Sequence, residues 1–260
     1  MKIATWNVNS LAVRLPQVLG WLAANPVEVL CLQELKLPDE KFPLQALQDA
    51  GYSHCAVFGQ KTYNGVAILS RHALSDVVLD IPGFADEQKR VISATLQTAQ
   101  GPLRVVCAYC PNGQSVGSDK YDYKLRWYAA LTDYLRQSLL ATPQLAILGD
   151  YNIAPDDRDV HDPAAWKDQV LCSAPERAAF QALPDLGLHD SFRLFEQEPA
   201  TWSWWDYRMN AFKRRMGLRI DHVLISDALR PHCRSSSVDS APRALERPSD
   251  HAPVIADLAL

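Results

Sequence analysis

The sequence predicts an α/β fold built on mixed β-sheets. Short apolar runs rich in β-branched residues recur along the chain, and turn residues bound most of them, which is typical of buried strands. These runs occupy residues 2–8, 27–32, 65–69, 91–96, 103–109, 145–149, 220–225 and 252–258. Helical patterns separate some of the runs, but several follow one another directly between residues 65 and 109. This order favours mixed sheets over a regular parallel βαβ arrangement.

Three segments between these strands have the residue spacing of helices. In segment 11–24, apolar residues recur three or four positions apart, and Asn25-Pro26 ends the run. Segment 120–140 has the same spacing, and Pro143 prevents its continuation. A third, shorter helix is expected at residues 175–183.

Length and composition indicate one domain over residues 1–260. With 260 residues, 48% of them hydrophobic, the chain can bury a substantial core, and it has no Gly/Ser-rich linker or short repeat. No window reaches the roughly 18 apolar residues of a membrane span, and the N-terminus lacks the features of a signal peptide. We therefore expect a soluble protein of the bacterial cytoplasm, with access to the nucleoid, that is monomeric.

The charge balance and the cysteines exclude two classes of protein. A net charge of -4 argues against a passive nucleic-acid coat protein, although an acidic metal site can coexist with a local basic face. Cys31 and Cys107 lie in apolar runs, where cysteine packs as a small hydrophobe. Cys107 and Cys110 form a CxxC pattern, but residues three apart on a strand point to opposite faces. We expect reduced, structural thiols rather than zinc or redox chemistry.

Polar residues repeatedly stand where an apolar strand ends or begins. The residues concerned are Asn7, Glu34, Tyr109, Asp150, Asn152, Asp221, Asp250 and His251. Taken singly, each is commonly a helix cap, a turn or a solvated strand end. Because strand ends can converge on one rim of packed sheets, the whole set predicts a single polar cleft.

These residue types suit a magnesium-dependent phosphodiesterase. Carboxylate and amide oxygens are the ligands that Mg²⁺ prefers, and Mn²⁺ is expected to substitute. Glu34 is the first expected ligand, and the full candidate set is Asn7, Glu34, Asp150, Asn152, Asp250 and His251. A phosphodiester in such a site needs its charge offset and a water aligned with the leaving oxygen.

The remaining candidates have distinct catalytic roles. Asp150 is expected to orient or deprotonate the water, and Asn152 to hydrogen-bond the nucleophile or a phosphate oxygen. His251 is expected to donate to the phosphate while Asp221 orients its imidazole ring. Tyr109 offers a hydroxyl to the phosphate or a proton to the leaving group.

The chain resembles the exonuclease III family of DNA-repair nucleases, within the endonuclease/exonuclease/phosphatase superfamily. The resemblance is carried, in family order, by Trp6-Asn7-Val8-Asn9, Gln33-Glu34-Leu35-Lys36, Tyr109-Cys110-Pro111-Asn112-Gly113, Gly149-Asp150-Tyr151-Asn152-Ile153, Trp205-Asp206-Tyr207-Arg208, Gly217-Leu218-Arg219-Ile220-Asp221 and Arg247-Pro248-Ser249-Asp250-His251-Ala252-Pro253. It implies a four-layer α/β sandwich, with two mixed β-sheets packed face to face and helices outside. It also implies cleavage of DNA 5′ to abasic sites, removal of nucleotides and blocking groups from 3′ ends, or both. The number of metal ions stays open.

Two segments favour duplex DNA as the substrate. Segment 208–219 is basic and contains no acid, so on a loop beside the cleft it would contact phosphates; the alternative is a solvated charged loop. With the Arg90 and Asn112 positions that resemble those of the family, the expected DNA contacts are Arg90, Asn112, Arg208, Lys213, Arg214, Arg215 and Arg219.

The resemblance also implies an apolar pocket for a base-free sugar, lined by Trp204, Leu218 and Ile220. Alternation along an extended segment would place Trp202 and Trp204 on one face, whereas Trp205 is expected in the core. Segment 154–174 departs from the family, and its bulk is expected to set the balance between abasic-site cleavage and 3′-end removal.

Two other functions stay open. A phosphodiesterase acting on inositol phosphates or phospholipids would use the same scaffold, but the basic loop and the apolar pocket argue against it. A catalytically silent DNA-binding protein would have lost a metal ligand or the histidine, and here every expected polar position is occupied.

Overall fold

The structure is a computed structural model that describes residues 1–260 and contains twelve strands. The strands are β1 (Lys2–Asn7), β2 (Val29–Gln33), β3 (His54–Phe58), β4 (Val66–Ser70), β5 (Ser75–Leu79), β6 (Val91–Thr98), β7 (Gly101–Tyr109), β8 (Leu145–Asp150), β9 (Leu188–Asp190), β10 (Asp221–Ser226), β11 (Cys233–Val238) and β12 (Val254–Leu258). The α-helices are α1 (Leu11–Ala24), α2 (Leu44–Asp49), α3 (Asp119–Ala141), α4 (Pro163–Trp166) and α5 (Ala174–Gln181). Short 3-10 turns occur in the connecting segments.

The strands form two six-stranded sheets, with orders β11-β12-β1-β2-β4-β3 and β5-β6-β7-β8-β10-β9. In each sheet one central pair is parallel, β1 with β2 and β7 with β8, and the other pairs are antiparallel. The expectation of mixed sheets is therefore confirmed.

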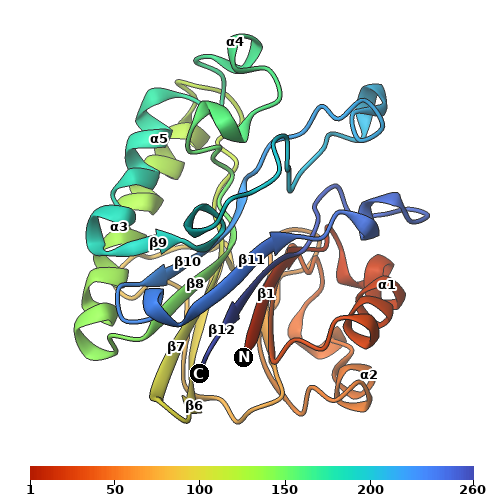
Figure 1. Ribbon diagram of the computed structural model, residues 1–260, viewed down its shortest axis with the longest axis vertical. Helices are drawn as coiled ribbons and strands as arrows, with labels where there is room; N and C mark the ends of the chain where they lie inside the picture. The colour runs from red at the N-terminus through yellow and green to blue at the C-terminus, as the bar shows by residue number, and fades with distance from the viewer.

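The two sheets pack face to face, with helices α1 and α2 on one outer face and α3 and α5 on the other (Figure 1). Three apolar clusters fill the spaces between these layers. One lies between the sheets and includes Ile3, Val105 and Leu148. The second joins α3 and α5 to their sheet, and the third joins α1 to the other sheet. The chain thus forms the expected four-layer sandwich.

The eight predicted strands and three predicted helices are present within a few residues of their expected bounds. Sequence analysis missed the strands β3, β5, β9 and β11 and the short helices α2 and α4. No helix combines the length and the apolar character that crossing a bilayer requires.

All six cysteines are free thiols. Cys107 belongs to the apolar cluster between the sheets, whereas Cys110 belongs to the cluster beneath α3. Their side chains therefore pack on opposite sides of one sheet, as the CxxC spacing predicts for an extended strand.

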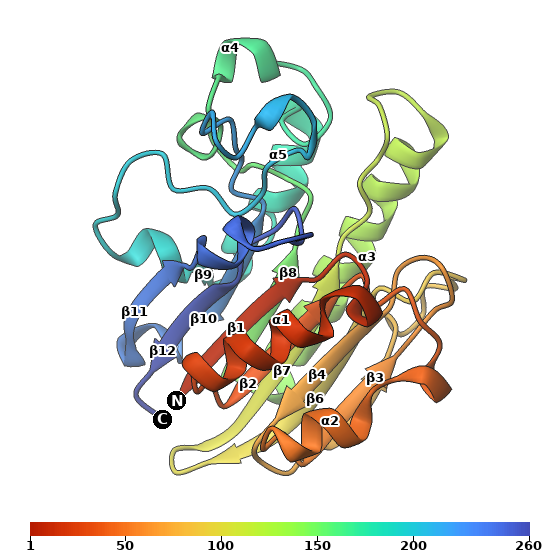
Figure 2. The same cartoon turned by 90° about the vertical axis from the view of Figure 1, so that its right-hand side faces the viewer.

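The strand register brings the predicted polar residues to one end of the sandwich. In one sheet Asn7 pairs with Gln33, directly before Glu34, and in the other Tyr109 and Asp221 both pair with Asp150. The two chain termini lie side by side at the opposite end, while the loops that carry α4 and the basic residues project above the strand ends (Figure 2).

Candidate active site

Hydrogen bonds join the strand ends of the two sheets into one polar cluster. The amide nitrogen of Asn7 donates to Glu34 Oε1 and to Asp150 Oδ2, each at 2.9 Å. The Tyr109 hydroxyl donates to the same Glu34 oxygen at 2.9 Å. Asn7 and Asp150 are buried, while Glu34 and Tyr109 are half-buried and open the cluster to solvent.

Two residues of this cluster have left-handed backbone conformations. Glu34 has φ 54° and Asn152 has φ 48°. Such a conformation is uncommon for residues other than glycine and is maintained by surrounding contacts. Each follows a strand end, so the chain turns sharply at the edge of the sheet and directs these side chains into the site.

His251 is held by a carboxylate on the other side of the cluster. Its Nδ1 lies 2.9 Å from Asp221 Oδ2, and its Nε2 lies 3.7 Å from Asp150 Oδ2. The Ser203 hydroxyl donates to Asp221 Oδ2 at 2.6 Å. The series Ser203–Asp221–His251 fixes the imidazole ring, with Nε2 facing Asp150.

Burial and neighbouring charges together raise the pKa values of both Asp150 and His251. Burial raises the pKa of Asp150 to about 7, with Asp221 adding to the effect and His251 opposing it. Burial alone would lower the pKa of His251, but Asp221 and Asp150 outweigh it and raise the pKa to about 10. His251 is therefore a cationic donor at neutral pH, and Asp150 can exchange a proton near neutrality.

The donor atoms fit a hard cation. Glu34, Asp150 and His251 each place one potential ligand atom within 4.8 Å of the others. Because the cationic form of His251 cannot coordinate, the two carboxylates are the available ligands at neutral pH. Two carboxylates with access to solvent are a set that Mg²⁺ accepts, completing its shell with waters. These side chains come from three separate strand ends.

The other predicted ligands are arranged differently. Asn7 presents its amide nitrogen to the carboxylates, and its oxygen accepts from the Asn9 backbone N–H, so its role as a ligand stays a prediction. Asp250 lies outside the three-residue group and accepts from Asn9 and from Trp204 Nε1. Asn152 donates to Cys110 O and to Asp150. Its amide oxygen accepts from Asn112.

The predicted DNA contacts divide into exposed and buried groups. Lys213, Arg214 and Arg215 are exposed on the loop above the strand ends, as is Arg208, which pairs with Asp206. Arg90 is 8% exposed and lies over the Tyr109 ring, on the wall of a cavity shared with Asn112.

Arg219 is a correction, because its guanidinium is not available to DNA. The residue is 1% exposed, and the group donates to Asp159 and Asp190 at 2.7 Å each. It also bonds His222 at 2.8 Å. Because all of these partners lie within the protein, the Arg219 side chain stabilises the fold and does not reach DNA.

The expected sugar pocket is a closed cluster. Leu218 and Ile220 are 0% and 1% exposed, and both pack in an apolar group that contains Leu171 of segment 154–174. Trp204 borders this group and is partly exposed. Leu218 and Ile220 are thus not accessible to solvent in this structure, and a sugar pocket lined by Trp204, Leu218 and Ile220 stays a prediction.

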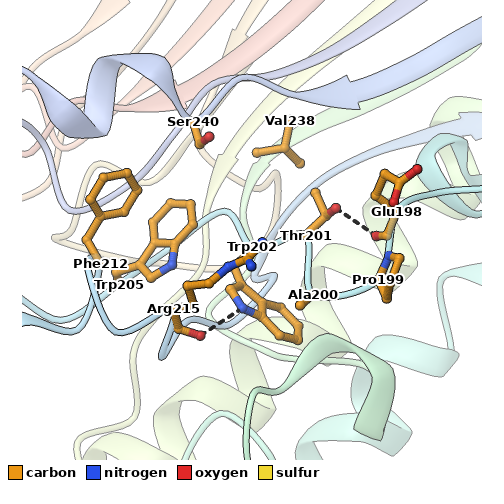
Figure 3. Close-up of a pocket in the computed structure, with 10 residues that line it drawn as sticks. All are labelled: Glu198, Pro199, Ala200, Thr201, Trp202, Trp205, Phe212, Arg215, Val238 and Ser240. Atoms are coloured by element: carbon orange, nitrogen blue, oxygen red, sulfur yellow. Dashed lines mark hydrogen bonds between the residues drawn. The ribbon is translucent and has the colours of Figure 1, made fainter.

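Alternation also fails in the tryptophan segment. Trp202 and Trp205 share one apolar cluster, whereas Trp204 packs against another. The segment is not a regular strand, since it forms only isolated bridges from Trp204 to Leu218 and to His251. Figure 3 shows Trp202, Trp205 and Phe212 around a separate surface pocket, with Trp202 Nε1 bonded to the Arg215 carbonyl at 3.2 Å. None of the predicted catalytic residues lines this pocket.

Sequence analysis missed three residues that shape the site. Lys36 Nζ lies 2.8 Å from Glu34 Oε2 and also bonds the Asn9 side chain. Ser203 orients Asp221, as described above. Lys36 and Asn9 lie in the sequence motifs around Glu34 and Asn7, two positions after each of them, and could have been predicted from that proximity. Nothing in the sequence around Ser203 predicts its contact with Asp221.

Comparisons with known proteins indicate the family of the chain. Residues 4–251 match the Endonuclease/Exonuclease/phosphatase family. The chain is 37% identical to an exodeoxyribonuclease III of Haemophilus influenzae, over 99% of both sequences. Its structure is similar to that of a 3′ phosphatase from Neisseria bound to a product DNA hairpin, with 51% identity, TM-score 0.95 and 99% coverage of both chains. It also resembles an AP endonuclease from Archaeoglobus fulgidus, with 35% identity, TM-score 0.94 and full coverage of both chains.

Proposed function

The chain belongs to the endonuclease/exonuclease/phosphatase family, and we propose that it is a metal-dependent DNA nuclease of the exodeoxyribonuclease III type. The observation that carries this function is the convergence of Glu34, Asp150 and the Asp221–His251 pair at one end of the sandwich. Full-length similarity to nucleases that act on DNA favours DNA over inositol phosphates or phospholipids.

We propose that Glu34 and Asp150 hold Mg²⁺. An ion bound there would offset phosphate charge and make a bound water more acidic. Lys36 and the donors on Glu34 already orient one of these carboxylates before metal binds. We expect Mn²⁺ to substitute, because it accepts the same oxygen-rich set.

The protein's own side chains account for the remaining chemistry. Asp150, which faces His251 Nε2, accepts a proton from the attacking water. Asn152, bonded to Asp150 and to Asn112, presents its amide to the attacking group. Protonated His251 donates from Nε2 to a phosphate oxygen, and Tyr109, whose pKa burial and Glu34 raise well above its usual value, stays a neutral donor.

We further propose that 3′ ends are preferred over abasic sites in continuous duplex. Leu171 is 4% exposed and packs with Leu218 and Ile220, where the family resemblance implies space for a base-free sugar. A terminal nucleotide does not require this space, because its sugar has no continuing strand to displace.

Labelled duplexes test both parts of the proposal. Three substrates are compared in Mg²⁺ and in EDTA: a recessed 3′ end, a 3′-phosphate end and an internal abasic-site analogue. We expect metal-dependent release at both 3′ ends and slower cleavage at the abasic site. No cleavage of any duplex in Mg²⁺, with hydrolysis of an inositol phosphate instead, would overturn the nuclease function. Faster cleavage of the abasic duplex would overturn only the preference.

A further inference from the structure

A fully buried ion pair lies directly behind the proposed active site. Lys124 of α3 and Glu176 of α5 are both 0% exposed, and Lys124 Nζ lies 2.5 Å from Glu176 Oε1. Burial lowers the pKa of Lys124, and Glu176 is the main group that opposes this effect. Charged side chains are rarely buried in this way, since desolvation costs several kcal/mol per ion.

The other two N–H donors of Lys124 bond to backbone carbonyls of the site. Its Nζ donates to the Asn152 carbonyl at 2.6 Å and to the Asn112 carbonyl at 3.1 Å. These are the two residues whose side chains bond each other at 3.1 Å beside Asp150. All three ammonium donors are therefore satisfied, two of them by main-chain atoms of residues in the proposed nuclease machinery.

The Asn152 contact restrains an unfavourable conformation. Asn152 has φ 48°, and its side chain bonds Cys110 O and Asp150 from that position. A charge-assisted bond to its carbonyl fixes the peptide that follows, which disfavours relaxation of the residue to a right-handed conformation. The orientation of the Asn152 amide thus depends on a cation that does not reach the substrate.

Glu176 carries the same restraint to segment 154–174. Its Oε1 accepts from the Leu171 backbone N–H at 3.0 Å, and its Oε2 accepts from the Ser173 N–H and hydroxyl. Leu171 packs in the apolar cluster that contains Leu218 and Ile220. One ion pair therefore links the Asn152 turn to segment 154–174.

The structure assigns Lys124, with Glu176, as a positioning residue of the reaction: the pair holds the backbone of Asn112 and Asn152 in the geometry that catalysis requires. This inference rests on the proposed nuclease function. A purely stabilising role is the competing explanation, because the pair also satisfies buried backbone groups of Asn112, Asn152, Leu171 and Ser173. The two roles are separated by whether a folded variant loses turnover and whether that loss depends on the Asn152 side chain.

The test compares four forms of the full-length protein on a 3′-recessed duplex in saturating Mg²⁺. They are the wild type, the double variant Lys124→Met/Glu176→Leu, the single variant Glu176→Gln, and a control that removes the exposed Asp133–Arg136 pair of α3 by double alanine substitution. Thermal unfolding by circular dichroism is measured beside kcat and KM.

We expect the apolar double variant to unfold at a lower temperature than the wild type, because the Asn112 and Asn152 carbonyls and the Leu171 and Ser173 N–H groups lose their partners. Assayed below its unfolding transition, it should lose about 10- to 100-fold in kcat, since small misplacement of catalytic groups has costs of that order. KM should change less than about three-fold, because the DNA-contact side chains remain. Glu176→Gln keeps one acceptor oxygen for Lys124 and Leu171 but presents a donor to Ser173, so it should be less stable than the wild type. Because Lys124 keeps its bonds to the Asn112 and Asn152 carbonyls, this variant should retain most of kcat. The control should match the wild type.

A second comparison tests whether the ion pair acts on turnover through the Asn152 side chain. Lys124→Met/Glu176→Leu should cost little further kcat in an Asn152→Ala background, because the side chain that the pair positions is then absent. If the apolar double variant does not fold, Lys124→Gln/Glu176→Gln replaces it with the same expected fall in kcat, because one amide cannot satisfy three acceptors.

A folded double variant with wild-type kcat would overturn the inference, as would a full further loss in the Asn152→Ala background. Inactive wild-type protein would instead overturn the proposed function, and the inference with it.

Discussion

Asp150 occupies the point where the two sheets exchange hydrogen bonds at the site. It accepts from Asn7 of the first sheet and from Asn152 beyond the end of its own strand, and it faces His251 Nε2. Asp150→Asn keeps the shape but removes the proton acceptor, so we expect kcat on a 3′-recessed duplex to fall by about 10²- to 10⁴-fold. Single-turnover rates with unchanged thermal unfolding would support this role, and a wild-type rate would remove Asp150 from the mechanism.

Glu34 is the carboxylate whose loss should act through the metal. Its two oxygens are aligned by Asn7, Tyr109 and Lys36, so the carboxylate requires little reorganisation to bind a cation. Glu34→Gln should raise the Mg²⁺ concentration for half-maximal activity by about 10- to 100-fold. Mg²⁺ titrations of turnover measure this shift, with the exposed Glu40→Gln as the control. An unchanged titration curve would contradict the assignment of Glu34 as a ligand.

Residues at strand ends could be predicted from sequence because the strand itself locates them. Glu34 and Asp150 each follow a buried apolar run, so their place at the sheet edge follows from the strand assignment. Arg219 could not be predicted in this way. Its partners Asp159 and Asp190 lie 60 and 29 positions away, and nothing local distinguishes it from the exposed arginines nearby.

We expect segment 154–174 to set the space beside the site through Leu171, a residue with an unusual backbone conformation. Leu171 has φ 77°, a conformation that suits glycine, yet it buries a large side chain. Leu171→Gly accepts the same backbone and empties space beside Leu218 and Ile220. We expect abasic-site cleavage, relative to 3′-end removal, to rise about 10-fold.

The same substitution should lower the free energy of unfolding by about 2–4 kcal/mol through the cavity that it leaves. Leu183→Ala, which removes a buried leucine from the cluster beneath α3, is the matched control. It should lower stability without altering the ratio of the two activities. An equal change of the ratio in both variants would show that lost stability, and not the opened cluster, is responsible.

The basic loop should contribute affinity rather than chemistry. Lys213, Arg214 and Arg215 are exposed and form no ion pair. Each phosphate contact removed should reduce the slope of log Kd against log salt by about 0.9. Binding of duplex DNA in EDTA, measured by fluorescence anisotropy for the triple alanine variant, gives this slope, with exposed Arg136→Ala as the control. An unchanged slope would mean that the loop does not contact the phosphates.

The strands that sequence analysis missed share one position in the fold. β3, β5, β9 and β11 are the four edges of the two sheets, whereas every predicted strand is interior. An edge strand lacks one neighbour and needs no continuous apolar run. β11 is half serine and mostly exposed or half-buried, and β9 has three residues. The interior of the fold was therefore predictable from hydrophobic pattern, and its edges were not.

The core of the whole molecule contains one histidine whose protonation should weaken folding. His222 is fully buried, and its Nδ1 accepts from Arg219 at 2.8 Å while its Nε2 faces the Ile153 carbonyl at 3.3 Å. The ring is thus neutral, with its proton on Nε2. Burial and then Arg219 hold the pKa of His222 well below its usual value, although Asp159 opposes them.

The sign of the pH effect follows from this depressed pKa. The unfolded chain protonates His222 below about pH 6.5, whereas the folded chain does not, so stability is present above that pH and falls as pH decreases. One proton contributes a slope of about 1.4 kcal/mol per pH unit. Asp150 acts in the opposite direction between pH 4 and 7, because its folded pKa is raised. The prediction therefore concerns the difference between wild type and variant.

His222→Phe keeps a ring against Tyr151 and Phe180 but removes the titrating group. Its free energy of unfolding will be lower than that of the wild type at pH 7.5, because Arg219 loses an acceptor. Between pH 6.5 and 5 the difference in unfolding free energy between wild type and variant should narrow, since only the wild type loses stability as His222 of its unfolded chain is protonated. Urea titrations at both pH values measure the gap, with exposed His72→Gln as the control. A gap that stays constant with pH would show that His222 takes up its proton in the folded protein as readily as in the unfolded chain.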